Sequence, residues 1–114
     1  MNDARDGIWI IDSNASTLFA NAAMAHILGE DVEQLIGKAS FDYVFPEDVA
    51  AAQHLFESKQ KGDKAPFRFR LRRKDGSEVR VFVQGTPMHN VVGDFMGIVG
   101  TFRIADEKTE KDAA

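Results

Sequence analysis

The sequence predicts one α+β domain in which helices cover one face of an antiparallel β-sheet. Residues 67–72 alternate apolar and basic side chains, and Asp75-Gly76 is a tight-turn signal between two strand-like segments. Short amphipathic helical patterns fill the stretch 21–59 before them. Consecutive hairpins favour antiparallel pairing, and helices grouped between strands pack on one face of the sheet. A length of 114 residues suits a single domain.

The N-terminal segment predicts a hairpin followed by a short helix. Residues 7–12 are apolar, β-branched and aromatic and end in Asp-Ser-Asn, which is typical of a strand entering a turn; 16–20 is the expected partner strand. Asn21 is placed to cap the helix and Gly29 to end it. Three residues at helical spacing form its apolar face: Met24, Ile27 and Leu28.

The central segment predicts a second short helix and then a longer one. The short helix is expected over 32–36, between Asp31 and Gly37. The aromatic segment 40–45 leads to Pro46-Glu47-Asp48, where proline at a first helical position and acids in the first turn predict a helix that runs to about Lys59. The stripe of this helix expected to face the sheet consists of Val49, Ala52, Gln53 and Phe56.

Three further strands are expected in the C-terminal half. In 67–72 the apolar residues face the core and the arginines face the other side. The turn at Asp75-Gly76 leads into a strand over 78–85, and a turn at 91–94 leads into a last apolar strand over 95–104. Gly97 and Gly100 allow close approach within it.

The first strand, which contains Trp9 and Ile11, is apolar on both of its faces. Its side away from the helices is therefore expected to contact an N-terminal helix or a second copy of the chain, and we expect a homodimer.

These pieces occur in an order that resembles a PAS domain. The resemblance rests on 7–12, Ala-Asn-Ala-Ala at 20–23, Leu-Gly at 28–29 with 33–38, Phe-Pro-Glu-Asp at 45–48, and 72–77. It implies a five-stranded antiparallel sheet in the order 2-1-5-4-3, with short helices and one longer helix on one face. Residues 7–104 would form the domain, 1–6 an N-terminal flank, and 105–114 a charged C-terminal tail that starts a linker helix to an effector.

The resemblance also implies a function. The chain would be the sensory input module of a multidomain signalling protein, such as a sensor histidine kinase or a cyclic-dinucleotide enzyme, and would transmit a ligand or interaction state to its effector. The alternative is a ligand-free interaction or dimerisation module. Neither interpretation gives the domain catalysis of its own.

The candidate pocket lies between the helices and the sheet. Its expected lining is Met24, Leu28, Phe41, Tyr43, Phe45, Val49, Gln53, Phe56, Phe69, Leu71 and Val83. An apolar space of this kind is either filled by its own side chains or left open for a ligand, and the sequence leaves both readings open. Tyr43 and Gln53 are the polar groups best placed to orient a ligand, or are simply satisfied at the edge of the core.

The absence of cysteine excludes several kinds of site. Disulfides, thiolate metal sites, the cysteinyl adduct of light-sensing relatives and the coumarate thioester of another branch all need a cysteine. Haem ligation through His54 is not expected, because His54 falls outside the predicted inward stripe. Noncovalent flavin has no supporting motif, and neither His26 nor His89 has a second ligand at metal-binding spacing.

Charge and hydropathy limit the classes of partner that we expect. A net charge of −4 disfavours nucleic acid, and the basic run 68–74 is expected to be a solvated face. The chain has neither an apolar run of about 18 residues nor an export signal, so we expect a cytoplasmic protein without direct membrane contact.

Overall fold

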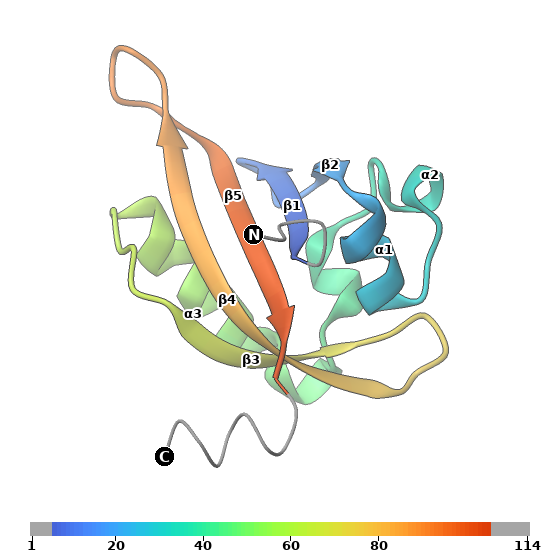
Figure 1. Cartoon of the computed structure of the whole chain (residues 1–114). Helices are drawn as coiled ribbons and strands as arrows, with labels where there is room; N and C mark the ends of the chain where they lie inside the picture. Colours follow the sequence, from blue (N-terminus) through green and yellow to red (C-terminus); the bar gives the residue numbers. More distant parts are fainter. Residues whose placement is uncertain (1–5, 106–114) are drawn as a thin grey trace.

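The computed structural model describes residues 6–105, so the expected linker helix in the tail lies outside the described residues. Five strands form one sheet in the order β2-β1-β5-β4-β3, and every neighbouring pair is antiparallel, as predicted (Figure 1). The strands are β1 (Gly7–Asp12), β2 (Thr17–Ala20), β3 (Phe67–Arg72), β4 (Glu78–His89) and β5 (Phe95–Ile104).

The helices lie between β2 and β3 in the chain. They are α1 (Ala22–Leu28), α2 (Val32–Leu35), the 3-10 turns η2 (Ser40–Tyr43) and η3 (Pro46–Asp48), and α3 (Val49–Gln60). The predicted caps are confirmed: the Asn21 side chain accepts a hydrogen bond from the Met24 backbone, and Gly29 ends α1 in the left-handed conformation with φ 71°. In Figure 1, α3 lies behind the sheet, on the face opposite the viewer.

Pairing along β5 fixes which residues of the central strands share a face. Trp9 pairs with Gly100, and Ile11 pairs with Ile98. Gly97 has a φ of 149°, and a Cβ atom there would overlap the carbonyl oxygen of Ile11. The close approach expected at Gly97 is thus confirmed, because only glycine lets β5 lie this near to β1.

The two apolar faces of β1 have different neighbours. Trp9 and Ile11 face the helices; Trp9 is 4% exposed and its indole N–H donates to the Thr17 hydroxyl. Ile8 and Ile10 alternate with them, so they lie on the outer face of the sheet. The outer apolar surface is therefore formed by these isoleucines and not by Trp9 or Ile11.

The core fills the space between α1, α2 and the inner face of the sheet. Its fully buried side chains are Met24, Leu28, Leu35 and Val81.

The bounds of four elements differ from expectation. α3 begins at Val49, since Pro46–Asp48 form the separate 3-10 turn η3, and α2 ends at Leu35. β4 continues past Gly85 to His89 because its pairing with β5 persists as far as a bulge at Met88/His89. Ser16 lies outside β2 and forms an isolated bridge to Ala39.

Candidate functional site

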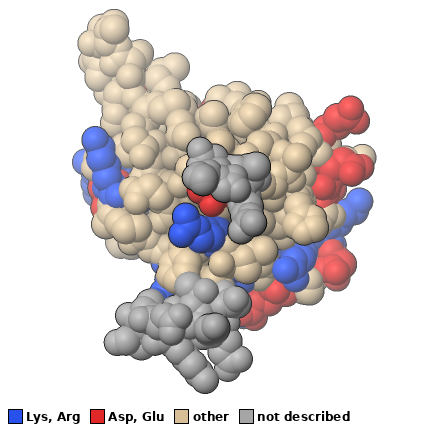
Figure 2. Space-filling view, in the orientation of Figure 1, with Lys and Arg blue, Asp and Glu red and all other residues tan. Residues whose placement is uncertain are grey.

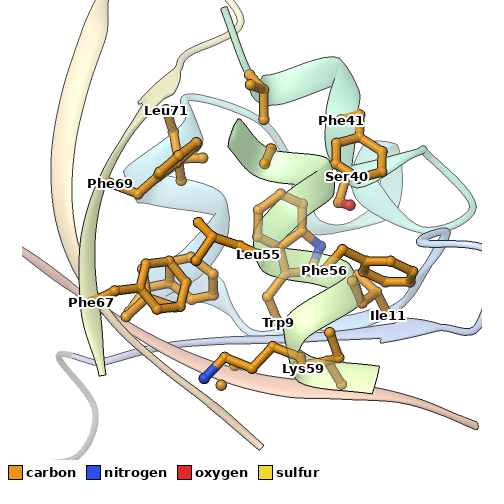
Figure 3. A pocket seen from close by; sticks show the side chains of 17 residues that line it. Trp9, Ile11, Ser40, Phe41, Leu55, Phe56, Lys59, Phe67, Phe69 and Leu71 are labelled. Atoms are coloured by element: carbon orange, nitrogen blue, oxygen red, sulfur yellow. The ribbon is translucent and has the colours of Figure 1, made fainter. Parts of the chain in front are cut away.

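A cavity of about 130 Å³ lies between α3 and the inner face of the sheet (Figure 3). Seventeen residues line it, drawn from β1, the η2 region, α3 and strands β3 to β5. Nearly all of the lining is aliphatic or aromatic, so the cavity favours an apolar occupant.

Two opposing residues of the sheet that border the cavity have no side chain. Gly85 on β4 pairs with Gly100 on β5, and both line the cavity. Above them α3 contributes Ala52, which is buried and has only a methyl group. An added Cβ would be 2.8 Å from the Phe102 ring at Gly100 and 3.4 Å from Lys59 Cε at Gly85, so the glycines let these side chains lie close to the sheet.

Five of the predicted lining residues border this cavity: Phe41, Phe56, Phe69, Leu71 and Val83. They come from four separate elements: η2, α3, β3 and β4. The ring of Phe56 packs against the rings of Phe41 and Phe95. Its ring centroid is 6.1 Å from that of Phe41 and 5.7 Å from that of Phe95, both in edge-to-face geometry. The aromatic wall is therefore packed around α3.

The other predicted lining residues lie elsewhere. Met24 and Leu28 are fully buried in the core, and Val49 packs against that core from the start of α3. Phe45 lies under the guanidinium of Arg70, 4.4 Å from its ring centroid. None of these four residues borders the cavity.

The predicted inward stripe of α3 is wrong at Gln53, which is exposed and cannot orient a ligand in the cavity. The helix instead turns a different set of residues inward: Ala52, Leu55, Phe56 and Lys59. This set also has helical spacing, but it ends on a lysine, and a lysine ordinarily indicates the solvent side of a helix. The inward face of α3 was therefore predicted incorrectly, because it includes a lysine.

Tyr43 is buried beside the cavity but not in its wall. Its hydroxyl donates to Glu30 Oε2 at 2.8 Å, and its ring packs edge-on against Trp9. Burial, together with the hydrogen bond to Glu30, raises the pKa of Tyr43 above its ordinary value. Of the two open readings, the structure supports a hydrogen-bonded tyrosine at the edge of the core.

Arg70 departs from the solvated basic face that the sequence predicted. Its guanidinium pairs with Glu47 at 3.0 Å, with Asp48 and with Glu78, and stacks on Phe45. The hydrogen bond to Asp48 is the main cause of a raised Arg70 pKa. These contacts tie the edge strand β3 to the start of α3, beside the cavity.

The histidine expectations can be placed directly. His54 is exposed on α3 and does not border the cavity, so the geometry offers no support for haem ligation through it. Within residues 6–105, no three His, Asp or Glu side chains gather as a metal-ion site would require. In the same range, no helix combines the length and hydropathy that a membrane crossing needs.

Comparison with known proteins bears on the whole chain. A family model described as the PAS fold matches residues 1–105. The uncharacterised protein y4lL of Sinorhizobium fredii (strain NBRC 101917 / NGR234) is 28% identical over 111 residues, which cover 96% of this chain and 13% of that protein. The chain thus spans a small part of this relative.

Two solved structures share the fold. A PAS domain from Colwellia psychrerythraea superposes with a TM-score of 0.80 at 20% identity, covering 87% of this chain and 85% of the other. A sensory box histidine kinase/response regulator from Burkholderia thailandensis E264 superposes with a TM-score of 0.74 at 19% identity, covering 96% and 85%. With the sheet order 2-1-5-4-3 and a family match over nearly its full length, this chain belongs to the PAS domain family.

Proposed function

We propose that the chain is the sensory input module of a larger signalling protein and that a small molecule in the cavity is its signal. The observation that carries this proposal is the cavity between α3 and the inner face of the sheet, which aromatic rings border. Catalysis would belong to an attached effector, since PAS domains are generally sensory and not catalytic.

The size of the cavity limits its ligand. Cavities of about 150 Å³ in other proteins take up benzene, whereas pockets for larger ligands span roughly 300–1,000 Å³. A cavity of about 130 Å³ suits one ring or a short alkyl chain. It is too small for haem or a tricyclic flavin, which supports the expectation that neither is the cofactor.

Two comparisons support a multidomain setting. The chain covers 13% of the S. fredii relative, which leaves room for other domains in that protein. The Burkholderia protein is a sensory box histidine kinase/response regulator, so a histidine kinase is the proposed effector class. A cyclic-dinucleotide enzyme is the alternative effector that the sequence resemblance implies. The proposed location of the protein is the cytoplasm.

The proposed mechanism is a shift between populations. A ligand that contacts both α3 and the sheet favours the arrangement in which these two walls are closest, and it can bias the effector only by its differential affinity for the two arrangements. Phe56 is the residue of α3 best placed to transmit ligand binding, because its ring contacts Phe41 of η2 and Phe95 of β5.

The test is mass spectrometry of the purified protein for a retained small molecule, followed by a thermal-shift screen of metabolites. A ligand at about 100 times its Kd should stabilise the fold by about 2.7 kcal/mol. Ala52→Leu should fill the hollow and abolish the shift, while Ala51→Leu, on the exposed side of the same helix, should retain it. Equal responses of the two variants, or no response to any metabolite, would contradict ligand sensing.

The outer face of the sheet favours a second candidate function, subunit association. Ile10 pairs with Phe19 on one side and with Val99 on the other, which makes an apolar row across three strands. Phe19 is 45% exposed, and Figure 2 shows few charged side chains on the visible part of this face. A second copy of the chain is the proposed partner, because pairing the exposed apolar rows of two copies removes both rows from water.

Sedimentation velocity tests this candidate. A dimer should form in the parent chain and dissociate in Ile10→Glu, while Ala51→Glu, at an exposed position of α3 on the opposite side of the sheet, should leave it intact. A parent chain that stays monomeric at high concentration would exclude association through this face.

A further inference from the structure

The wall of the cavity beneath α3 consists almost entirely of carbon. Among the described residues that line it, only Trp9, Ser40 and Lys59 have a polar group in the side chain. The other lining residues are aliphatic or aromatic, or are glycines without a side chain. The chemistry that the cavity offers to a ligand therefore depends on where these three polar groups find their partners.

The nitrogen atoms of Trp9 and Lys59 are engaged with other parts of the protein. The indole N–H of Trp9 donates a buried hydrogen bond of 2.9 Å to the hydroxyl of Thr17. The ammonium of Lys59 donates to the backbone carbonyl of Ala65 at 2.9 Å and lies 5.3 Å from the ring centroid of Phe67. Trp9 therefore contributes its ring to the cavity wall, and Lys59 contributes its methylene groups (Figure 3).

The hydroxyl and backbone groups near the cavity add no partner for a polar ligand. The surface that the lining presents to the cavity is almost wholly apolar, so Ser40 borders it with carbon and not with its hydroxyl. The Tyr43 hydroxyl donates to Glu30 at 2.8 Å, and Tyr43 does not border the cavity. The backbone groups of Gly85 and Gly100 lie in the plane of the sheet, where hydrogen bonds join neighbouring strands. Within the described residues, a molecule in this cavity would therefore meet carbon on all sides.

We propose that the ligand of this cavity is an unsubstituted hydrocarbon of one ring or a short chain, and that the cavity rejects analogues carrying a hydroxyl, an amine or a carboxylate. A polar group that enters an apolar site loses its hydrogen bonds to water and gains none in return, which lowers its affinity. A hydrocarbon loses no hydrogen bonds and gains contacts with the rings of Phe41, Phe56 and Phe69. This inference rests on the proposed function, that the cavity holds a small molecule, and adds the chemical class of that molecule.

Benzene and phenol form a matched pair of probes, because they share one ring and differ by a single hydroxyl. Calorimetric titration of the purified protein gives the two dissociation constants. Benzene should bind at least about ten-fold more tightly than phenol, as an unpaired hydroxyl in an apolar site requires. Phenol that binds as tightly as benzene would overturn the hydrocarbon assignment.

Two valines of β4 provide matched variants. Val83 borders the cavity and is 6% exposed, whereas Val79 is 4% exposed and does not border it. Replacing either valine by threonine exchanges a methyl group for a hydroxyl, and circular dichroism checks that both variants fold. Val83→Thr should bring the affinities for phenol and benzene closer, because its hydroxyl gives phenol a partner, while Val79→Thr should keep the preference of the parent chain. Equal preferences in the two variants would contradict selection by the cavity wall.

The outcomes separate this inference from the proposed function. If phenol, or a polar metabolite from the thermal-shift screen, binds in the cavity as tightly as benzene, the hydrocarbon class is wrong although the cavity is still a ligand site. If benzene produces no binding heat and the screen finds no ligand, both proposals fail.

Discussion

Replacing Phe56 by aspartate tests which side of α3 faces the sheet. Phe56 is partly buried and borders the cavity, between the rings of Phe41 and Phe95. Truncating a fully buried phenylalanine costs about 3–5 kcal/mol, so partial burial suggests about 2 kcal/mol here. Placing a carboxylate among those rings adds about 2 kcal/mol for a buried group without partners. The expected loss is therefore about 4 kcal/mol, much of the roughly 5–15 kcal/mol available to a domain.

Gln53→Asp is the matched control, because it introduces the same residue into the same helix at an exposed position. It should cost about 0.5 kcal/mol. Urea denaturation followed by far-UV circular dichroism measures both variants. With a slope of about 1.5 kcal/mol/M, Phe56→Asp should lower the midpoint by about 2–3 M and Gln53→Asp by a few tenths. Equal losses, or a larger loss for Gln53→Asp, would refute the orientation of α3 described above.

Three further outcomes are expected. Met24→Ala should cost about 3 kcal/mol in urea denaturation, because Met24 is fully buried and its removal leaves a void. Gly97→Ala should reduce the hydrogen-exchange protection of β1 amides, since the new methyl would overlap the Ile11 carbonyl; unchanged protection would argue against this close approach. Tyr43→Phe should cost about 1–3 kcal/mol at neutral pH, because buried Glu30 loses its donor. Because the pKa of Tyr43 is raised, the folded state keeps a proton that the unfolded state loses above about pH 10. The stability of the parent chain should therefore fall above about pH 10, and the stability of Tyr43→Phe should fall less.

The sequence predicted the fold well because its local signals agree with one another. The alternation in 67–72, the Asp-Gly turn at 75–76, and the caps Asn21 and Gly29 each act within a few residues. Local chemistry of this kind survives in the folded chain, and the structure has the expected sheet order and helices. Residues 67, 69 and 71 therefore face the cavity side as predicted.

The candidate site was less predictable because it depends on contacts between distant elements. Gly85 and Gly100, which both border the cavity, are brought together only by the register of β4 with β5. Trp9 is buried, although the sequence does not say which face of β1 the helices cover. Lys59 was missed because lysine is normally exposed, and only the packed structure reveals a buried one.

Amide chemical-shift mapping of a benzene titration tests most directly whether the cavity beneath α3 is a binding site. The largest shifts are expected at Gly85, Gly100 and Phe56, which border the cavity, and little change at Val91 in the exposed turn between β4 and β5. Saturating benzene that leaves the amides of the cavity residues unshifted, or shifts concentrated away from them, would contradict ligand binding in this cavity.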